Sequence, residues 1–456
     1  MENSAETLFN DLGQRYEDAY ANSPHLKGFL HAAIDHLPPD SRVLDVGCGT
    51  GTPVASMLAS AGHHVHGIDV SQEMLSIARR QVKGTFEKAD MRAYSPASPV
   101  DGLFVIFSLY QIPPGETYSM CFRFSEWLNP GGMLVIATSP GPSPHPSSNV
   151  DLDFVVHDAT WDATRYFQRM WMGTPTIETL FTADAWRAML RDAGFSITAE
   201  VVYDFAPQDA NHNVNERHQI FLARKVHDNP LLGPFPMPTL WGPWESPSPL
   251  NGIVDHLVGK ELDLIRAKIF NKPNVLYLGP PMNDIDLQAR CTQFHGPIDT
   301  LPFSSEKFER VLALCRLDHV ADHSKTLSEI LRVTSQTKGS QIIFIQAAPD
   351  NEILKIFNSL PHSPKIPHQG ALLGAAMEQL SEDGSRDISL TRVDAKYQFP
   401  GENVSQKCED AMKMLSGLYQ PGDAEELRSR LRLHFRDGAQ PVGCGLAMLE
   451  ATSVSN

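Results

Sequence analysis

Three glycines next to a carboxylate are the residues best placed to do chemistry in this 456-residue chain. They are Gly47, Gly49 and Gly51, which alternate with other residues at the end of the segment VLDVGCGTG. Glycine lets a backbone turn tightly and approach a ligand, and the helix expected next offers free N–H groups. Asp45 lies two residues before the first glycine, where it would repel a pyrophosphate but suit an ammonium or sulfonium group. The G-x-G-x-G spacing also departs from the G-x-G-x-x-G of dinucleotide sites.

Two further carboxylates follow at the ends of expected strands. Asp69, in GIDVS, lies 18 residues after Gly51, where a carboxylate can accept both ribose hydroxyls of a nucleoside. Asp90, in KADM, closes the third strand and is placed to accept from an adenine amino group. Together with the glycine loop, these residues predict a site for a cationic nucleoside.

Alternating strands and helices must position this loop. Apolar residues at helical spacing predict helices within residues 1–40, with Ser23-Pro24 as a start. Strand-like runs follow at 43–46, 63–70, 101–109 and 132–138, separated by helical segments. This alternation predicts an α/β fold with a doubly wound parallel sheet. Two last strands, 197–205 and 217–225, are expected to form an antiparallel hairpin.

In this order, the motifs resemble those of class I S-adenosylmethionine-dependent methyltransferases of the small-molecule type. The resemblance covers residues about 15–225 and rests on VLDVGCGTG, GIDVSQEML, KADM, DGLFVIFSLYQI and LNPGGMLVI. It implies a Rossmann-like sheet and S-adenosyl-L-methionine as the cofactor. In the family pattern, the loop Asp45 to Gly51 holds the methionine moiety and the other contacts come from nearby strand ends. The cofactor residues implied are Tyr16, Tyr20, Asp45, Gly47, Cys48, Gly49, Gly51, Asp69, Val70, Met74, Asp90, Met91, Ser108 and Gln111.

Those residues would take distinct parts of the cofactor. Asp69 would bind the ribose, Val70 and Met74 would border the adenine, and Asp90 with Met91 would hold its far side. Ser108 and Gln111 would close the site from the fourth strand. Tyr16 and Tyr20 resemble N-terminal aromatics that cover the sulfonium in a cation–π role; packing as an amphipathic core is the alternative.

An aromatic-rich segment, residues 139–180, interrupts the strand–helix pattern after the fifth strand. Ligands of open α/β sheets lie beyond the carboxyl ends of the strands, so this segment is expected to roof the site. A small satellite core is the alternative. Its aromatic residues and one from the last hairpin are the predicted substrate contacts: Trp161, Tyr166, Trp171 and Tyr203.

Methyl transfer needs a general base only if the nucleophile is protonated. The base candidates are His145, His157 and His218, and the hairpin loop should bring His212 and Glu216 to the same face. The resemblance assigns none of these, because substrate residues vary widely in the family.

Charge, hydropathy and cysteine content indicate which partners and which cellular compartment to expect. The net charge of −16 argues against nucleic acid, and no apolar run is long enough to predict a membrane span. The N-terminus has no secretory signal, and six cysteines without C-x-x-C spacing indicate reduced thiols and no zinc site. We therefore expect a cytoplasmic protein without a metal.

The second half of the chain repeats the first in faint form. After a linker with seven prolines, residues 227–252, the segment VLYLGPP echoes VLDVGCG. It puts Tyr277 in the place of Asp45 and Pro281 in the place of Gly49, which removes the carboxylate and an N–H donor. The repeat is about 25 residues shorter, where a strand–helix–strand would be missing. The predicted domains are therefore a catalytic domain at 1–226 and a truncated, degenerate methyltransferase-like domain at 253–456.

The sequence therefore predicts methyl transfer to an O, N or S atom of a small, aromatic or heterocyclic metabolite, as in secondary metabolism. The second domain would serve as a lid, as part of the substrate pocket or as a homodimer interface. One alternative is a phosphoethanolamine-type tandem methyltransferase. Only Arg165 and Arg169 could meet a phosphate near the roof, and their spacing of four predicts that they share one helix face. Another is a cofactor-binding regulator or scaffold, similar to methyltransferase-like regulators.

Overall fold

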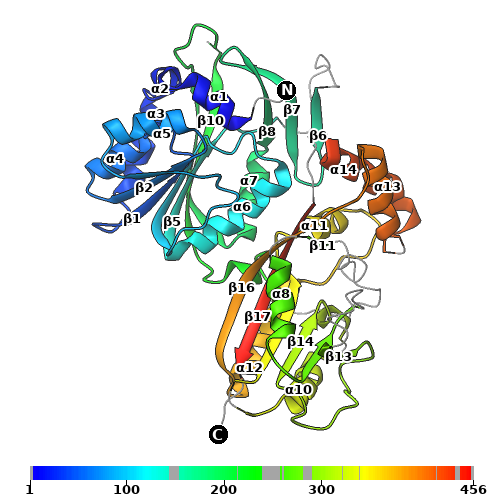
Figure 1. The fold of residues 1–456 in the computed structure, drawn as a ribbon. Helices are drawn as coiled ribbons and strands as arrows, with labels where there is room; N and C mark the ends of the chain where they lie inside the picture. The colour runs from blue at the N-terminus through cyan, green and yellow to red at the C-terminus, as the bar shows by residue number, and fades with distance from the viewer. Residues whose placement is uncertain are drawn as a thin grey trace. The chain divides into compact units, whose positions relative to one another are not determined.

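The chain forms two compact units, Met1–Pro230 and Leu231–Asn456 (Figure 1). The computed structural model describes residues 4–142, 154–212, 214–238, 257–258, 261–280, 290–320, 322–337, 339–416, 418–436 and 442–452. The division falls inside the predicted linker, whose residues 239–252 lie outside the described part. Each unit is therefore considered by itself.

The first unit is built on a seven-stranded sheet in the order β3-β2-β1-β4-β5-β10-β9. The first five strands in this order run parallel, while β10 pairs antiparallel with both β5 and β9. The predicted fold class and final hairpin are thus confirmed. The strands are β1 (Arg42–Val46), β2 (His64–Asp69), β3 (Thr85–Lys88), β4 (Val100–Ile106), β5 (Leu128–Thr138), β9 (Phe195–Phe205) and β10 (Glu216–Lys225).

Helices cover both faces of this sheet. One apolar core packs α3 (Pro24–Ile34), α4 (Val54–Ser60) and α5 (Gln72–Gln81) against it, and another packs α6 (Pro114–Trp127) and α7 (Ala183–Asp192). Ser23, Ser71 and Thr182 cap α3, α5 and α7 through their hydroxyls. Two short helices, α1 (Ala5–Leu12) and α2 (Gln14–Tyr20), precede them.

The aromatic-rich segment forms a separate sheet rather than a loop. Its three antiparallel strands are β6 (Val155–Asp158), β7 (Ala163–Trp171) and β8 (Thr174–Phe181). The idea that Arg165 and Arg169 share a helix face is therefore wrong, because both lie on strand β7. Aromatic and β-branched residues dominate this stretch and favour strands.

The second unit has a sheet in the order β11-β16-β17-β15-β14-β12-β13. Apart from the short β11, this is the strand order of the first sheet without β3. Residues 295–309 carry no helix or strand, although the first unit has α5 and β3 at this point, so this region is shorter as expected. The second unit thus has an α/β fold, and its interpretation as a degenerate methyltransferase-like domain stays a prediction. Its strands are β11 (Leu257–Val258), β12 (Val275–Leu278), β13 (Cys291–Phe294), β14 (Arg310–Leu314), β15 (Gln341–Ala347), β16 (Arg386–Tyr397) and β17 (Val442–Thr452).

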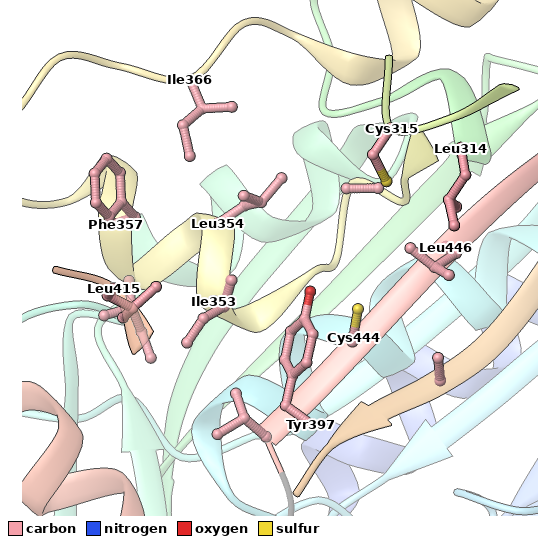
Figure 2. Packing of buried hydrophobic residues seen from close by; sticks show 14 of the residues in the cluster. Leu314, Cys315, Ile353, Leu354, Phe357, Ile366, Tyr397, Leu415, Cys444 and Leu446 are labelled. Atoms are coloured by element: carbon pink, nitrogen blue, oxygen red, sulfur yellow. The ribbon is translucent and has the colours of Figure 1, made fainter. Parts of the chain in front are cut away.

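Two helical layers also cover this second sheet. One core holds α8 (Glu261–Phe270), α11 (Glu352–Asn358), α13 (Val404–Met414) and α14 (Ala424–Arg436), with Tyr397 and Cys444 at its centre (Figure 2). The other holds α10 (His323–Val333) and α12 (Gln369–Glu382). The amphipathic helices α13 and α14 thus bury apolar residues in their own unit, and a role in dimer formation stays a prediction. Within the described ranges, every helix is too short or too polar to cross a bilayer.

Candidate active site

The glycine loop after β1 owes its shape to three residues in left-handed backbone conformations. The φ angles of Gly47, Gly49 and Gly51 are +70°, +53° and +82°. The N–H groups of Gly47 and Cys48 both donate to the carbonyl of Ile68 on β2, which ties the loop to the neighbouring strand. A Cβ on Gly47 would lie 2.3 Å from the Cβ of Ser108. Only glycine fits there, so the sequence motif marks a real close approach.

Asp45 ends in this loop as a buried carboxylate without a cation. It is 1% exposed, and its Oδ2 has no hydrogen-bond partner among the described residues. Burial, together with the nearby charge of Asp69, raises the pKa of this carboxyl to about 8. The hydroxyl of Ser108, across the loop, is also buried without a partner in the described part. Such orphaned polar atoms fit a ligand that brings an ammonium group.

Asp69 braces the loop from the end of β2. Its Oδ2 accepts from the N–H of Gly49 at 2.9 Å, and its Oδ1 accepts from the N–H of Ser71 at 2.8 Å. Burial raises the pKa of Asp69, and these backbone bonds counteract that rise. Because a carboxylate oxygen accepts more than one hydrogen bond, a ribose role for Asp69 is compatible with this geometry and stays a prediction.

The residues expected around the adenine do not border either cavity described below. Met74 is fully buried with Leu8 of α1, and Met91 packs against the main core. Asp90 forms an ion pair with Arg92 at 2.6 Å, and Val70 follows β2 at intermediate exposure. Helix α1 covers this edge, since the side chain of Asn10 accepts from Ser71 Oγ and the N–H of Glu73. The adenine contacts of Val70, Met74, Asp90 and Met91 therefore stay a prediction.

Two adjoining cavities lie at the carboxyl ends of the strands. The smaller, about 50 Å³, borders the loop and is lined by Asp45, Gly47, Cys48 and Gly49. The larger, about 350 Å³, is lined by Ser108, Gln111, Tyr166 and Trp171, among others. Tyr16, Tyr20, Phe107 and His218 line both cavities and form the wall between them. A wider depression of about 960 Å³ lies elsewhere in the unit, along the amino ends of β1 and β2, and contains none of the predicted residues.

Glu216, at the start of β10, is the centre of the polar network in the larger cavity. Its Oε1 accepts from the hydroxyl of Tyr20 at 2.9 Å and lies 2.7 Å from Nε2 of His212. Its Oε2 lies 2.9 Å from Nε2 of His218. Burial acts to raise the pKa of Glu216, but the bonds to His218, His212 and Tyr20 together hold it below its usual value. The carboxylate is therefore ionised at neutral pH.

His218 is one of the three predicted base candidates, and its geometry argues against that role. Its Nε2 faces Glu216, and its Nδ1 lies 3.3 Å from the hydroxyl of Tyr203. With the proton on Nε2, the tautomer that these partners favour, Nδ1 accepts from Tyr203 and no lone pair is free for a substrate. His157 lies on β6 and lines neither cavity, and His145 lies outside the described residues.

The predicted substrate residues divide into two groups. Tyr166 and Trp171 line the larger cavity, and the indole Nε1–H of Trp171 donates to the hydroxyl of Tyr20 at 2.9 Å. Trp161, in the turn between β6 and β7, instead packs against Tyr118 in the core. Tyr203 lies behind His218 and stacks on His25, so it positions the histidine without lining a cavity.

Sequence reasoning missed a second carboxylate in this cavity. Glu178 on β8 accepts from Arg169 at 2.7 Å, and Arg169 also lies over the ring of Tyr166. Burial raises the pKa of Glu178, and Arg169 opposes that rise. The sequence signal for Glu178 would have been an oppositely charged residue on the neighbouring strand. That signal can be recognised only once the aromatic segment is known to form a sheet.

Comparison with known proteins places the first unit in a family. Residues 43–132 match the model of a methyltransferase domain. Trans-aconitate 2-methyltransferase of Methylobacterium nodulans is 35% identical over 102 residues, which cover 22% of this chain and 39% of that protein. Phosphoethanolamine N-methyltransferase 1 of Arabidopsis thaliana is 36% identical over 108 residues, covering 22% of each chain.

A solved structure of 1,6-didemethyltoxoflavin-N1-methyltransferase from Burkholderia thailandensis is 17% identical, with a TM-score of 0.37, and the match covers 49% of this chain and 87% of that one. The chain spans less than two thirds of the length of the two curated relatives named above. The first unit thus contains a methyltransferase domain, and the strand order of its sheet is that of the class I S-adenosylmethionine-dependent enzymes.

Proposed function

We propose that the first unit transfers a methyl group from S-adenosylmethionine to a small aromatic or heterocyclic metabolite of the kind made in secondary metabolism. The observation that carries this proposal is the pair of adjoining cavities at the carboxyl ends of the strands. The larger, about 350 Å³, has the size of a site for one small organic molecule, and seven phenylalanine, tyrosine and tryptophan side chains line it.

The residues of the smaller cavity fit the methionine part of the cofactor. Asp45 supplies a buried carboxylate for its ammonium group, and Gly47, Cys48 and Gly49 of the loop border the same cavity. Tyr16 and Tyr20, stacked with ring centroids 5.1 Å apart, line both cavities where a sulfonium would lie. When bound, S-adenosylmethionine supplies an electrophilic methyl group.

The protein then has to orient the acceptor and exclude water. Tyr20 is fixed for this task, because its hydroxyl donates to Glu216 and accepts from Trp171. Helix α1 and the β6-β7-β8 sheet cover the site, with Phe9 and Trp171 meeting at 6.0 Å between ring centroids. These contacts support a closed aromatic chamber for an in-line displacement.

A phosphorylated acceptor is disfavoured by the same cavity. Arg169 is already committed to Glu178, and Arg165 is buried with its guanidinium over the ring of Phe167, which leaves the exposed Arg217 as the arginine of this cavity that could meet a phosphate. We therefore keep the phosphoethanolamine-type reaction as the weaker alternative, although a relative carries that name.

Calorimetric titration of S-adenosylmethionine into the full-length chain, followed by a mass-spectrometric screen of small metabolites for a gain of one methyl group, tests the proposal. We expect one cofactor site per chain and a methylated product. Cofactor binding without any product would favour the regulator alternative, and two sites would contradict our view that the second unit is degenerate.

A further inference from the structure

The larger cavity holds two carboxylates in different electrostatic situations. Glu178 is balanced by Arg169 at 2.7 Å. Among the described residues, Glu216 has no lysine or arginine partner, and its neighbours are Tyr20, His212 and His218. An ionised carboxylate that is largely buried without a cation is costly, unless a ligand brings the missing charge. Glu216 is therefore the carboxylate of this cavity whose direct partners are a phenol and two imidazoles, while the exposed Arg217 also lines the cavity.

The surroundings of Glu216 suit a positive group. The rings of Tyr16, Tyr20, Phe107 and Trp171 line the same space, and aromatic faces attract organic cations. Oε1 of Glu216 has two hydrogen-bond partners, whereas Oε2 has one, His218. A carboxylate oxygen accepts two such bonds, so Oε2 keeps room for another donor.

We propose that the acceptor atom is an amine nitrogen and that Glu216 is the carboxylate that holds it beside the aromatic wall. This inference rests on the proposed methyl transfer and goes beyond it by choosing nitrogen among the possible acceptor atoms.

The chemistry of the step supports this choice. The ammonium form of the substrate loses a proton to water, and the nitrogen lone pair then forms the bond to the methyl carbon as the carbon–sulfur bond breaks. The electron pair of that bond stays on sulfur, so the positive charge passes to nitrogen, next to Glu216. A hydroxyl acceptor would instead need a base to take its proton, and both nitrogens of His218 are engaged.

Binding of matched amine and alcohol pairs to the wild-type chain tests this without requiring the natural substrate. Tryptamine and tyramine would be titrated against tryptophol and tyrosol, with and without S-adenosylhomocysteine. We expect each amine to bind at least about tenfold more tightly than its alcohol, as for a hydrogen bond to a charged group. Equal binding, or no amine binding at millimolar concentration, would overturn the inference.

Glu216→Gln is the variant that isolates the charge, because the amide keeps the shape of the side chain. It should weaken amine binding about tenfold or more and leave alcohol binding within about twofold. Glu200→Gln is the matched control, since Glu200 lies on β9, bonds to Arg187 and Gln219, and lines neither cavity.

The cofactor measurement separates the two possible failures. If Glu216→Gln weakens S-adenosylmethionine but not S-adenosylhomocysteine, with amine binding unchanged, the carboxylate serves the sulfonium and the inference is wrong. If the wild-type chain binds the cofactor and methylates an alcohol but no amine, the proposed function stands and the inference falls. If the chain binds no cofactor, the proposed function fails, while the amine titration still decides what Glu216 binds.

Discussion

The two units place opposite kinds of side chain at the end of their first strand. In the first, Asp45 is a buried carboxylate that faces a cavity. In the second, strand register puts Tyr277 at the same place, fully buried, with its hydroxyl donating to the carbonyl of Pro280 at 3.0 Å. A Cβ on Gly279 would lie 2.3 Å from that hydroxyl, so the tyrosine fills the space above its own loop. Pro281 lies outside the described residues.

The neighbouring strands, β2 in the first unit and β13 in the second, also differ by the loss of a carboxylate. Register puts His295 of the second unit where Asp69 stands in the first. Asp69 accepts from the N–H of Gly49, whereas Nδ1 of His295 lies 2.9 Å from the carbonyl of Gly279. A histidine that donates to the loop leaves no carboxylate for a ribose.

The backbone after the fourth strand is nevertheless the same in both units. Phe107 and Cys315 occupy equivalent positions with φ of +56° and +50°, rare for side chains of this kind. Each donates its N–H to the neighbouring strand, to Ala137 and to Ile345. The turn therefore belongs to the fold, because it persists in the second unit, where Tyr277 and His295 replace Asp45 and Asp69.

Substitution of Asp45 in the first unit should weaken cofactor binding strongly, whereas substitution of Tyr277 in the second should not. Asp45→Asn removes the proposed partner of the cofactor's ammonium, and we expect about a hundredfold loss of S-adenosylmethionine affinity. Tyr277→Phe removes only the hydroxyl in the second unit and should leave the affinity unchanged. Calorimetric titration of both variants provides the measurement.

The unfolding midpoint serves as the control, because neither variant should lower the stability at pH 8 by more than about 1 kcal/mol. A weakened cofactor site in Tyr277→Phe would mean that the second unit takes part in binding and that the comparison is drawn wrongly.

Two alanine substitutions in the first loop separate backbone strain from close packing. Gly47→Ala combines a positive φ with a contact of 2.3 Å to Ser108, whereas Gly49→Ala has a positive φ and no atom within 4 Å of the new Cβ. We expect Gly47→Ala to cost about 2 kcal/mol more in unfolding free energy. Denaturant titration of both variants measures this difference. Equal losses of unfolding free energy would show that Ser108 moves aside at little energetic cost.

Much of this molecule could be predicted from its sequence, because its strands are nearly continuous apolar runs and its loop glycines are closely spaced. Asp45 and Gly47 were found for that reason, and the repeat of VLDVGCG as VLYLGPP pointed to the second domain. Trp161, Phe107 and the pairing of Glu178 with Arg169 were misplaced or missed. Each depends on a tertiary contact or a local φ that hydrophobic periodicity does not encode. An aromatic residue gives the same sequence pattern whether its side chain faces a cavity or the core.

The pH response of the first loop sharpens the comparison further. Burial raises the pKa of Asp45 to about 8, so its proton stays bound in the folded chain up to that pH. The stability of the unligated protein should therefore fall as pH rises from about 4 towards 8, and Asp45→Asn should lack this component. Cofactor affinity should move oppositely, falling about tenfold per pH unit below 8 as the carboxylate is protonated. Titrations at pH 6, 7 and 8 measure this, and an Asp45→Asn variant with the same pH profile would contradict it.

The smallest expected effect comes from Tyr203, which touches the site only through His218. Its hydroxyl lies 3.3 Å from Nδ1 of the histidine, a long bond whose loss costs about 0.5–1 kcal/mol. Tyr203→Phe should therefore reduce the turnover of the methylated acceptor two- to fivefold, with little change in cofactor affinity. Initial rates at saturating acceptor, compared with the KM for that acceptor, separate positioning from binding. A loss of activity as large as that of His218→Ala would instead mean that Tyr203 reaches the substrate, and that the hairpin contributes more of the site than its cavity-lining residues indicate.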